Sequence, residues 1–497
     1  MDKDLQSIQQ ARDMIQAARR AWLQWREASQ AQVDRVCEAM ANVSYRESER
    51  LGQMASEETG YGVPVHKMLK NHLCSQLLWS KIKDIRTVGV VRHDPQARIF
   101  DIAWPYGVVA ALIPSTNPTS TVMFKTLIAV KARNAIVVAP HPASTNCCVE
   151  TSRVMAAAAV EAGAPPGLMA CMSLVSLPGT QELMSHRYTA LILATGGSDM
   201  VKAAHSVGKP AYGVGPGNVP CYVDRSANLE RAARYIVASK AFDYSTICAT
   251  EQAVIADKPI ARELERLLVA NGAHFLDEYQ TIKIAGVLFF PNGAINAQAV
   301  GKSPQQLAEM AGISVPGATR ILVVRLDKVG RDEPLSREKL TTVLGWYESD
   351  GWEAGCERCI DLINFGGRGH SLVIHAEDDD VIMRFGLEKP VFRIVVNTMG
   401  TMGTTGLTTD LMPSMTLGSG GIGGSITGDN IGVQHMFNVK RLAYENAPPP
   451  ELAMHGGPSS SSAVHTSSAL DSERLPRMPS ESEIDAVVAR VLQDLAQ

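Results

Sequence analysis

Cys248 is the residue of this chain with the clearest capacity for chemistry. It lies in Phe242-Asp-Tyr-Ser-Thr-Ile-Cys-Ala-Thr-Glu-Gln252, just before the apolar run Gln-Ala-Val-Ile, which is typical of a strand. A thiol on a turn between two regular elements faces a cleft and is framed by backbone N–H groups, as a nucleophile that attacks a carbonyl requires. The alternative is a small buried core cysteine. Other segments of the chain decide between the two.

Asn117 is the second candidate, in Ile113-Pro-Ser-Thr-Asn-Pro-Thr119 after a strand-like run. Its side-chain N–H could hold a developing oxyanion, and the alternative is a turn-forming Asn-Pro pair. In Leu193-Ala-Thr-Gly-Gly-Ser-Asp199, a strand is followed by glycines that open a helix, so backbone N–H groups could approach a pyrophosphate, although the spacing is not GxGxxG. A second glycine loop, Tyr212-Gly-Val-Gly-Pro-Gly-Asn218, contains no acidic residue.

Bulk composition excludes several classes of protein. The chain has 497 residues, 45% of them hydrophobic and 20% charged, with a net charge of −4. These values suit a globular protein of two or three structural units and give no reason to expect nucleic acid or an anionic membrane as partner. No apolar run approaches the roughly 18 residues of a membrane span, and the first residues lack the apolar core of a signal peptide. Nine irregularly spaced cysteines indicate reduced thiols, and the lone pair Cys356 and Cys359 is interpreted as structural, without a metal.

The elements that must position these residues follow from hydrophobic periodicity. A helical period over residues 3–58 predicts two or three helices, and residues 85–104 alternate like a β-hairpin around His93-Asp94-Pro95. From Tyr106 onward, short apolar runs alternate with helical segments, which predicts an α/β fold with a doubly wound parallel sheet. A second such region follows Cys248. Residues 400–432 have the composition of loops that cross a surface or a site, and residues 433–444 are strand-like.

The last fifty residues have a different character. Residues 446–478 are rich in proline, glycine and serine and are predicted to be a disordered linker. Residues 479–497 predict an amphipathic helix that is too short to be stable alone and needs a partner. Its apolar stripe consists of Ile484, Val487, Val488, Val491, Leu492 and Leu495.

Together these segments resemble the aldehyde dehydrogenase superfamily and, within it, the CoA-acylating branch. The resemblance runs from about residue 10 to residue 445, and several motifs occur in the family's order. They are Ile113-Pro-Ser-Thr-Asn-Pro-Thr-Ser-Thr121, Ala194-Thr-Gly-Gly197, Gly213-Val-Gly-Pro-Gly-Asn218, Phe242–Gln252, Arg368-Gly-His-Ser-Leu-Val-Ile-His375 and Asp429-Asn-Ile-Gly … Phe437-Asn-Val-Lys-Arg-Leu-Ala443.

The resemblance implies roles for individual residues. Cys248 would attack an aldehyde to give a thiohemiacetal, and hydride transfer to NAD⁺ would leave a thioacyl-enzyme. Asn117 and the backbone N–H of Cys248 would hold the oxyanion. Glu338 would hold the nicotinamide ribose; its alternative is a solvated helix charge. His141 stands where hydrolytic relatives carry a lysine, so NADP⁺ stays open beside NAD⁺. The expected cofactor-binding residues are Pro114, Ser115, His141, Thr195, Gly196, Gly197, Gly215 and Glu338.

One absence separates the branches of this family. Hydrolytic relatives place a glutamate in the loop that is here Gly213–Asn218, where it activates water. Without a general base, water attacks slowly, whereas a thiolate needs less activation, so coenzyme A is expected as acyl acceptor. His370 is expected to assist that thiol or to tune the site, unless it is a structural histidine; His375 is interpreted as structural. The alternatives are an enzyme that releases the free acid and a catalytically degenerate scaffold.

The resemblance also implies a domain plan and partners. Residues 1–84 and 105–224 would bind the dinucleotide, residues 225–432 would form the catalytic domain, and residues 85–104 and 433–445 an arm that pairs subunits into a homodimer or a dimer of dimers. The substrate would be a short aldehyde such as acetaldehyde or propionaldehyde. Residues 479–497 resemble the encapsulation peptides of bacterial microcompartment enzymes, which would place the protein inside such a compartment in the cytoplasm, bound to a shell or cargo protein. The alternative is a helix that docks on its own chain or on a partner subunit.

Overall fold

The computed structural model describes residues 2–447. The predicted linker 446–478, beyond its first two residues, and the predicted helix 479–497 lie outside the described residues. The described chain divides into two units, residues 2–85 with 105–436 and residues 86–104 with 437–447. Within residues 2–447, no helix combines the length and the apolar character needed to cross a membrane.

The chain begins with a layer of helices, as the helical period predicts. Apolar positions three and four residues apart bury one face of each of the first two helices, and Ser29 and Gln32 form a capping box at the start of the second. A π-helical turn, Leu73–Leu77, joins the fourth helix to the fifth. The helices are α1 Lys3–Trp25, α2 Gln30–Arg46, α3 Ser48–Thr59, α4 Pro64–His72 and α5 Leu78–Ile82.

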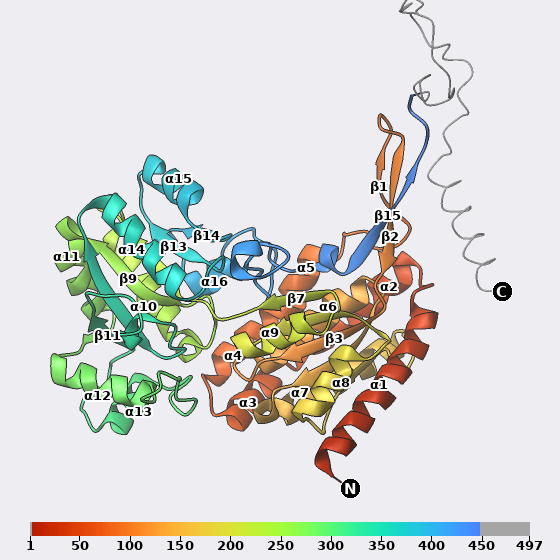
Figure 1. Ribbon diagram of the computed structural model, residues 1–497, viewed down its shortest axis with the longest axis horizontal. Coiled ribbons are helices and arrows are strands. Elements are labelled where there is room, and N and C mark those ends of the chain that lie inside the picture. Colours follow the sequence, from red (N-terminus) through yellow and green to blue (C-terminus); the bar gives the residue numbers. More distant parts are fainter. Residues whose placement is uncertain (1, 448–497) are drawn as a thin grey trace, which may run out of the picture. The chain divides into compact units, whose positions relative to one another are not determined.

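A five-stranded parallel sheet follows, with strand order β5-β4-β3-β6-β7. Figure 1 marks two of its strands, β3 and β7. All residues of β3 and β4 are buried because helices cover both faces of the sheet. Strand order reverses between β3 and β6, and such a switch point opens a crevice at the carboxyl ends of the strands. The elements are β3 Val108–Ile113, α6 Pro118–Lys131, β4 Ala135–Pro140, α7 Thr145–Glu161, β5 Met169–Cys171, α8 Leu177–Ser185, β6 Thr189–Thr195, α9 Ser198–Ser206 and β7 Ala211–Val214.

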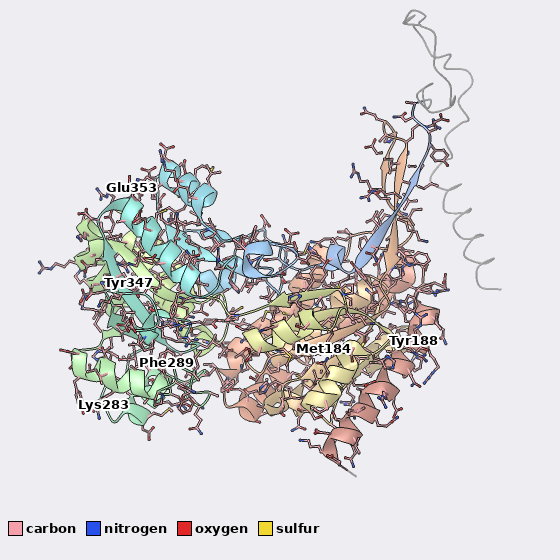
Figure 2. All side chains as sticks on the ribbon, viewed as in Figure 1. Met184, Tyr188, Lys283, Phe289, Tyr347 and Glu353 are labelled. Atoms are coloured by element: carbon pink, nitrogen blue, oxygen red, sulfur yellow. The ribbon has the colours of Figure 1, made fainter. Side chains whose placement is uncertain are left out.

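The second sheet has seven strands in the order β10-β11-β12-β9-β8-β13-β14. Alternate residues of its strands belong to two core clusters: Ala253 and Ile255 pack in one, and Val254 and Ala256 in the other. Tyr347 and Phe289, marked in Figure 2, belong to the first cluster. The elements are β8 Val219–Val223, α10 Leu229–Ala241, β9 Glu251–Asp257, α11 Lys258–Ala270, β10 Ala273–Phe275, α12 Glu278–Leu288, α13 Pro304–Ala311, β11 Ile321–Arg325, β12 Val343–Ser349, α14 Gly351–Phe365, β13 Leu372–His375, α15 Asp379–Glu388, β14 Ile394–Val396 and α16 Gly400–Thr404.

These two parallel sheets confirm the predicted α/β fold class. The segment 400–432 differs from the prediction because it contains the single helical turn α16 as well as loops. The predicted strand 433–444 begins four residues later, as β15 Phe437–Ala443. Residues 433–435 form a 3₁₀ turn instead, in which the backbone N–H of Gly432 donates to Nδ1 of His435 at 3.1 Å.

The second unit is a three-stranded sheet of order β1-β2-β15, with β1 Val90–Asp94 antiparallel to β2 Ile99–Pro105. The ammonium of Lys440 lies 3.3 Å from the ring centroid of Trp104, and Arg441 pairs with Asp101 at 3.4 Å. Strand β15 forms one edge of this sheet and is exposed along six of its seven residues. An exposed edge strand presents unpaired backbone groups that can pair with another chain.

Candidate active site

The predicted site residues come from loops at the ends of strands in both sheets. Pro114–Asn117 follow β3 and Gly196–Gly197 follow β6, at the switch point of the first sheet. Cys248, Glu338 and His370 instead precede β9, β12 and β13 of the second sheet. Because these strands are parallel, their amino ends lie at one edge. The site therefore lies between the carboxyl edge of one sheet and the amino edge of the other.

A cavity of about 370 Å³ occupies this place, within the size range of small-molecule sites. His370 is not among the residues that line the cavity. It contacts the sulfur of Cys248. Two apolar residues of the lining, Ile247 and Leu417, belong to a core cluster against which Cys248 packs. The predicted site residues that line the cavity are Cys248, Asn117, Pro114, Ser115, His141, Thr195, Gly196, Gly197, Gly215 and Glu338.

Cys248 and His370 form a thiol–imidazole pair. Sγ of Cys248 lies 3.3 Å from Nε2 of His370, and Nδ1 of His370 lies 3.0 Å from Oγ of Ser371. If that hydroxyl accepts from Nδ1, the lone pair on Nε2 faces the thiol. Gly217 lies against both residues, and a side chain there would overlap the carbonyl oxygen of Cys248 and the ring of His370. The glycine is therefore required by close approach of the loop to the nucleophile.

Burial sets the protonation of this pair. Burial, with a smaller contribution from the charge of Glu338, raises the pKa of the Cys248 thiol to about 12, although Arg393 acts to lower it. Burial and the positive charge of Arg393 together lower the pKa of His370 to about 3. At neutral pH the pair therefore consists of a neutral thiol beside a neutral imidazole.

Arg393 is a buried cation that the sequence analysis did not single out. Its guanidinium donates to backbone carbonyls, at 2.9 Å to His370 and 2.8 Å to Gly428, and also contacts the carbonyl oxygen of Gly418. Among the described residues it forms no ion pair with a carboxylate, and burial lowers its pKa to about 10. The sequence pattern that could have identified Arg393 is its charge inside the apolar run Val-Phe-Arg-Ile-Val-Val396, because an arginine is rarely buried without specific partners.

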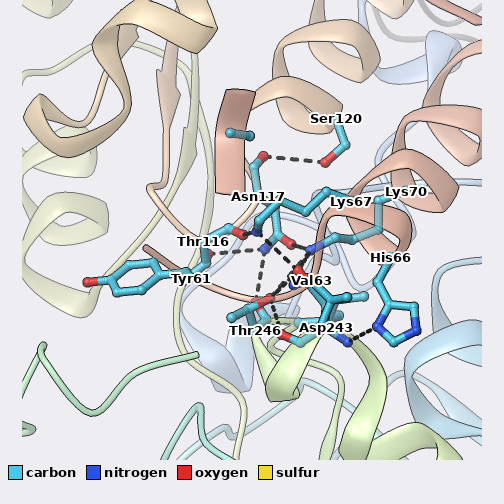
Figure 3. Close-up of polar contacts among 12 residues, drawn as sticks. Tyr61, Val63, His66, Lys67, Lys70, Thr116, Asn117, Ser120, Asp243 and Thr246 are labelled. Atoms are coloured by element: carbon cyan, nitrogen blue, oxygen red, sulfur yellow. Dashed lines mark hydrogen bonds and ion pairs between the residues drawn. The ribbon is translucent and has the colours of Figure 1, made fainter. Parts of the chain in front are cut away.

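Asn117 departs from the usual role of an asparagine at a helix start. It is the N-cap residue of α6, yet its side chain caps no backbone N–H of that helix. Nδ2 instead donates to the carbonyl oxygen of Thr246 at 3.0 Å and to Oγ1 of Thr116 at 3.1 Å (Figure 3). Oδ1 accepts from Nζ of Lys70 at 2.5 Å. One amide N–H therefore faces the loop that carries Cys248, and the other is held by the neighbouring Thr116.

Glu338 is neither solvated nor helical, which rules out the alternative interpretation of this residue. It lies in the loop before β12, is 8% exposed, and accepts a hydrogen bond from the backbone N–H of Gly217 at 3.0 Å. Burial raises its pKa to about 7. The glycine loop that has no acidic residue of its own thus receives a carboxylate from 121 positions further along the chain. An acidic residue therefore contacts this loop, which the sequence of the loop alone does not show.

Two helices begin shortly after residues that line the cavity, α7 after Pro142 and α9 after Gly197, and their N-termini have different surroundings. At α7, Glu58 accepts from the N–H groups of Asn146 at 2.8 Å and Cys147 at 2.7 Å, which satisfies that terminus. At α9, the N-cap residue Gly197 offers no capping side chain, and a Cβ there would meet no atom within 4 Å. An uncapped helix start beside a glycine turn fits a pyrophosphate. The residues at the switch point therefore fit a dinucleotide.

Three further residues considered from the sequence, Cys356, Cys359 and His375, do not line the cavity. Cys359 is fully buried, and Cys356 contacts the ammonium of Lys389. Both ring nitrogens of the buried His375 lack a hydrogen-bond partner among the described residues. No group of three or more histidine, cysteine or acidic side chains in residues 2–447 is arranged to hold a metal ion.

Comparison with known sequences agrees with this geometry. A model of the aldehyde dehydrogenase family matches residues 4–275. Aldehyde-alcohol dehydrogenase 2 of Entamoeba histolytica is 37% identical over 84% of this chain and 49% of its own length, so the chain spans about half of this relative. An acetylating succinate-semialdehyde dehydrogenase of Clostridium kluyveri is 35% identical over 88% of this chain and 96% of its own.

Solved structures extend the similarity. An acetylating aldehyde dehydrogenase from Geobacillus thermoglucosidasius is 48% identical, with a TM-score of 0.89 over 90% of this chain and 99% of its own. A propionaldehyde dehydrogenase from a fucose-utilisation microcompartment of Clostridium phytofermentans is 26% identical, with a TM-score of 0.80 over 88% and 98%. The propionaldehyde dehydrogenase of Rhodopseudomonas palustris, solved with CoA and an acylated cysteine, is 25% identical, with a TM-score of 0.79 over 87% and 97%.

Proposed function

Because the chain belongs to the aldehyde dehydrogenase family, we propose that it is a CoA-acylating enzyme: aldehyde + CoA + NAD⁺ gives acyl-CoA + NADH + H⁺. The observation that carries the proposal is the Cys248–His370 contact at the cavity that also reaches the open N-terminus of α9. The acetylating relatives support it. The apolar lining near the thiol suits a short aliphatic aldehyde, such as acetaldehyde or propionaldehyde.

The proposed chemistry begins with Cys248. Its sulfur forms a bond to the carbonyl carbon while the thiol proton passes to Nε2 of His370, and the carbonyl oxygen becomes an oxyanion held by Asn117 and the N–H of Cys248. NAD⁺, when bound, accepts hydride from that carbon. The thioester that remains on Cys248 is attacked by the thiolate of CoA, and the Cys248 sulfur leaves. In the proposed sequence His370 releases its first proton to solvent, then takes the CoA proton and returns it to the leaving Cys248 sulfur.

The dinucleotide is proposed to bind along the cavity wall. Gly196 and Gly197 would hold the pyrophosphate at α9, with Pro114, Ser115, Thr195 and Gly215 beside them, and Glu338 would hold the nicotinamide ribose. His141 also lines the cavity; burial lowers its pKa, and its Nδ1 accepts from the N–H of Ala143 at 3.1 Å. A neutral imidazole with one nitrogen occupied is compatible with NAD⁺ as well as NADP⁺.

Omission of CoA tests the acyl acceptor. With CoA, we expect sustained NADH formation and acyl-CoA as the product identified by mass spectrometry. Without CoA, NADH formation should slow by at least about tenfold after one turnover per site, because a thiolate needs less activation than water and the loop Gly213–Asn218 contains no acidic residue of its own. Full-rate turnover to the carboxylate without CoA would contradict the proposal.

Glu338 is the residue that would account for turnover to the carboxylate without CoA. A carboxylate with a pKa of about 7 in the cavity could activate water, which favours a hydrolytic enzyme as the second candidate. The variant Glu338→Gln, assayed without CoA, identifies the source of any carboxylate product. A CoA-independent rate that disappears in this variant would assign hydrolysis to Glu338.

The domain plan and the oligomer are further proposals. Residues 1–84 with 105–224 are proposed to bind the dinucleotide and residues 225–432 to carry the catalytic thiol. Residues 85–104 and 433–445 are proposed to pair subunits, as a homodimer or a dimer of dimers. Support comes from the exposed edge strand β15, with Val439 and Leu442 exposed by 39% and 48%. A monomeric mass in light scattering would contradict this pairing.

We also propose that residues 479–497 direct the enzyme into a bacterial microcompartment in the cytoplasm, by laying their apolar stripe on a shell or cargo protein. The microcompartment propionaldehyde dehydrogenase supports this proposal. Residues 479–497 fused to a fluorescent protein should form puncta in compartment-forming cells, and a matched fusion with Val488→Asp and Leu492→Asp should stay diffuse. Diffuse fluorescence of the unchanged fusion would contradict the proposal and favour a helix that docks on its own chain.

A further inference from the structure

A buried cluster of charges lies behind the proposed oxyanion site. Lys67 and Lys70, one turn apart on α4, both reach the carboxylate of Asp243, and all three side chains are at most 3% exposed. Figure 3 shows the lysines and Asp243 converging beside Asn117 and Thr246. Burying charged groups is costly unless they are paired and hydrogen-bonded. A cluster of two ammonium groups and one carboxylate therefore needs an explanation beyond stability.

Lys70 fixes the orientation of the Asn117 amide. An ammonium group only donates, so the atom of Asn117 that faces Lys70 must be the carbonyl oxygen Oδ1. Nδ2 must then lie on the opposite side, where it donates to the Thr246 carbonyl in the loop before Cys248 and to Oγ1 of Thr116. An amide alone has no such preference, since its oxygen and nitrogen are similar in size. The positive charge also draws electron density toward Oδ1, which makes the N–H groups better donors.

Asp243 fixes Lys70 and the nucleophile loop together. Its carboxylate accepts from Lys70, from Oγ1 of Thr246 at 2.6 Å and from the backbone N–H of Val63 at 2.7 Å. Gly62 makes this approach possible, because a side chain there would overlap the Asp243 carboxylate. The same residue therefore joins the loop before Cys248 to the helix that bears Lys70.

The nucleophile loop needs this support because its backbone is strained. Asp243, Tyr244 and Ser245 have φ values of 47°, 47° and 67°, three consecutive non-glycine residues in the left-handed region. Each costs roughly 1–2 kcal/mol relative to a right-handed conformation. Such strain persists where surrounding contacts over-determine the conformation, commonly at functional sites.

We propose that Lys70 is a positioning residue for the oxyanion site: anchored by Asp243, its ammonium holds Oδ1 of Asn117 so that the amide N–H groups face the carbonyl oxygen of the substrate bound to Cys248. The proposal rests on the proposed aldehyde oxidation. It assigns Lys70 no contact with substrate. Lys70 affects the reaction rate only by orienting the Asn117 amide.

Lys67 provides a matched control. It lies on the same helix and shares the same carboxylate oxygen at 3.2 Å, but its second partner is the carbonyl oxygen of Thr116 at 3.2 Å. Loss of either lysine leaves one ammonium for Asp243. Only loss of Lys70 removes the contact with the Asn117 side chain.

A double-mutant cycle tests this assignment. The readout is the rate of the first NADH turnover without CoA, together with the dissociation constant for NAD⁺ from protein fluorescence. Lys70→Met should slow this turnover by roughly 10- to 100-fold, less than removal of an oxyanion donor itself, and leave NAD⁺ binding unchanged. In an Asn117→Ala background, Lys70→Met should slow the first turnover by less than about a further twofold. Lys67→Met should slow it by the same factor in this background as in the wild type.

Two results would overturn the proposal. One is a Lys70→Met enzyme with a first-turnover rate within about twofold of the wild-type rate. The other is a Lys70→Met substitution that slows the Asn117→Ala enzyme by the same factor as it slows the wild type. If Lys70→Met does not fold, Lys70→Gln enters the same cycle with the same expected non-additivity. Because the first turnover needs no acyl acceptor, the cycle can fail while CoA dependence holds, and the reverse.

Discussion

Replacing Cys248 by alanine is expected to lower kcat for aldehyde oxidation by at least about 10³-fold, since no covalent intermediate can form without the sulfur. Binding of the dinucleotide should persist, because the glycine turns at α9 and the remaining cavity wall are untouched. The measurement is NADH formation with CoA present, beside NAD⁺ binding by fluorescence.

Cys171→Ala is the matched control for a lost thiol. Cys171 lies on β5, is buried to 8% exposure and does not line the cavity. We expect it to retain near wild-type activity. A Cys248→Ala enzyme that kept more than about a tenth of the wild-type rate would point to another nucleophile or to a non-covalent route.

Asn117→Ala is expected to have the next largest effect, a loss of about 10²–10³ in kcat, the usual cost of removing one oxyanion donor. In the resting site its N–H groups donate to the Thr246 carbonyl and to Oγ1 of Thr116. An oxyanion is the stronger acceptor and should displace the neutral hydroxyl, since hydrogen bonds to charged groups are roughly twice as strong.

Asn117→Asp separates this role from packing. Aspartate has nearly the same size as asparagine but cannot donate, and its carboxylate would pair with Lys70. We expect a loss at least as large as that of Asn117→Ala, with thermal stability near that of the wild type. If Asn117→Asp kept most of the wild-type kcat, measured under saturating aldehyde, the oxyanion assignment would be wrong.

The fold and the cavity wall were predictable because they depend on local patterns. The continuous apolar run of β3 signals a strand covered on both faces, and the glycines after β6 signal a tight turn into a helix. In a parallel doubly wound sheet, such strand-end loops meet at a switch point. This rule brings Asn117 and Gly197 to one cavity without any knowledge of side-chain contacts.

The contacts that support the site could not be predicted, for physical reasons. Lys70 meets Asp243 across 173 positions and Glu338 meets Gly217 across 121, and no periodicity encodes such pairs. The left-handed backbone of Asp243–Ser245 contains no glycine to signal it. The position of Arg393 in an apolar segment indicates a buried charge. The sequence does not indicate which backbone carbonyls accept its hydrogen bonds.

The central claim is that Cys248 carries an acyl group which CoA, and not water, removes. The most direct test mixes the full-length enzyme with NAD⁺ and propionaldehyde without CoA, quenches it in acid after one turnover, and maps the modified peptide by mass spectrometry. The account predicts one propionyl group per active site on Cys248, lost within one turnover time when CoA is added before the quench, with propionyl-CoA as product. An unmodified Cys248 with free propionate already formed in the absence of CoA would contradict it.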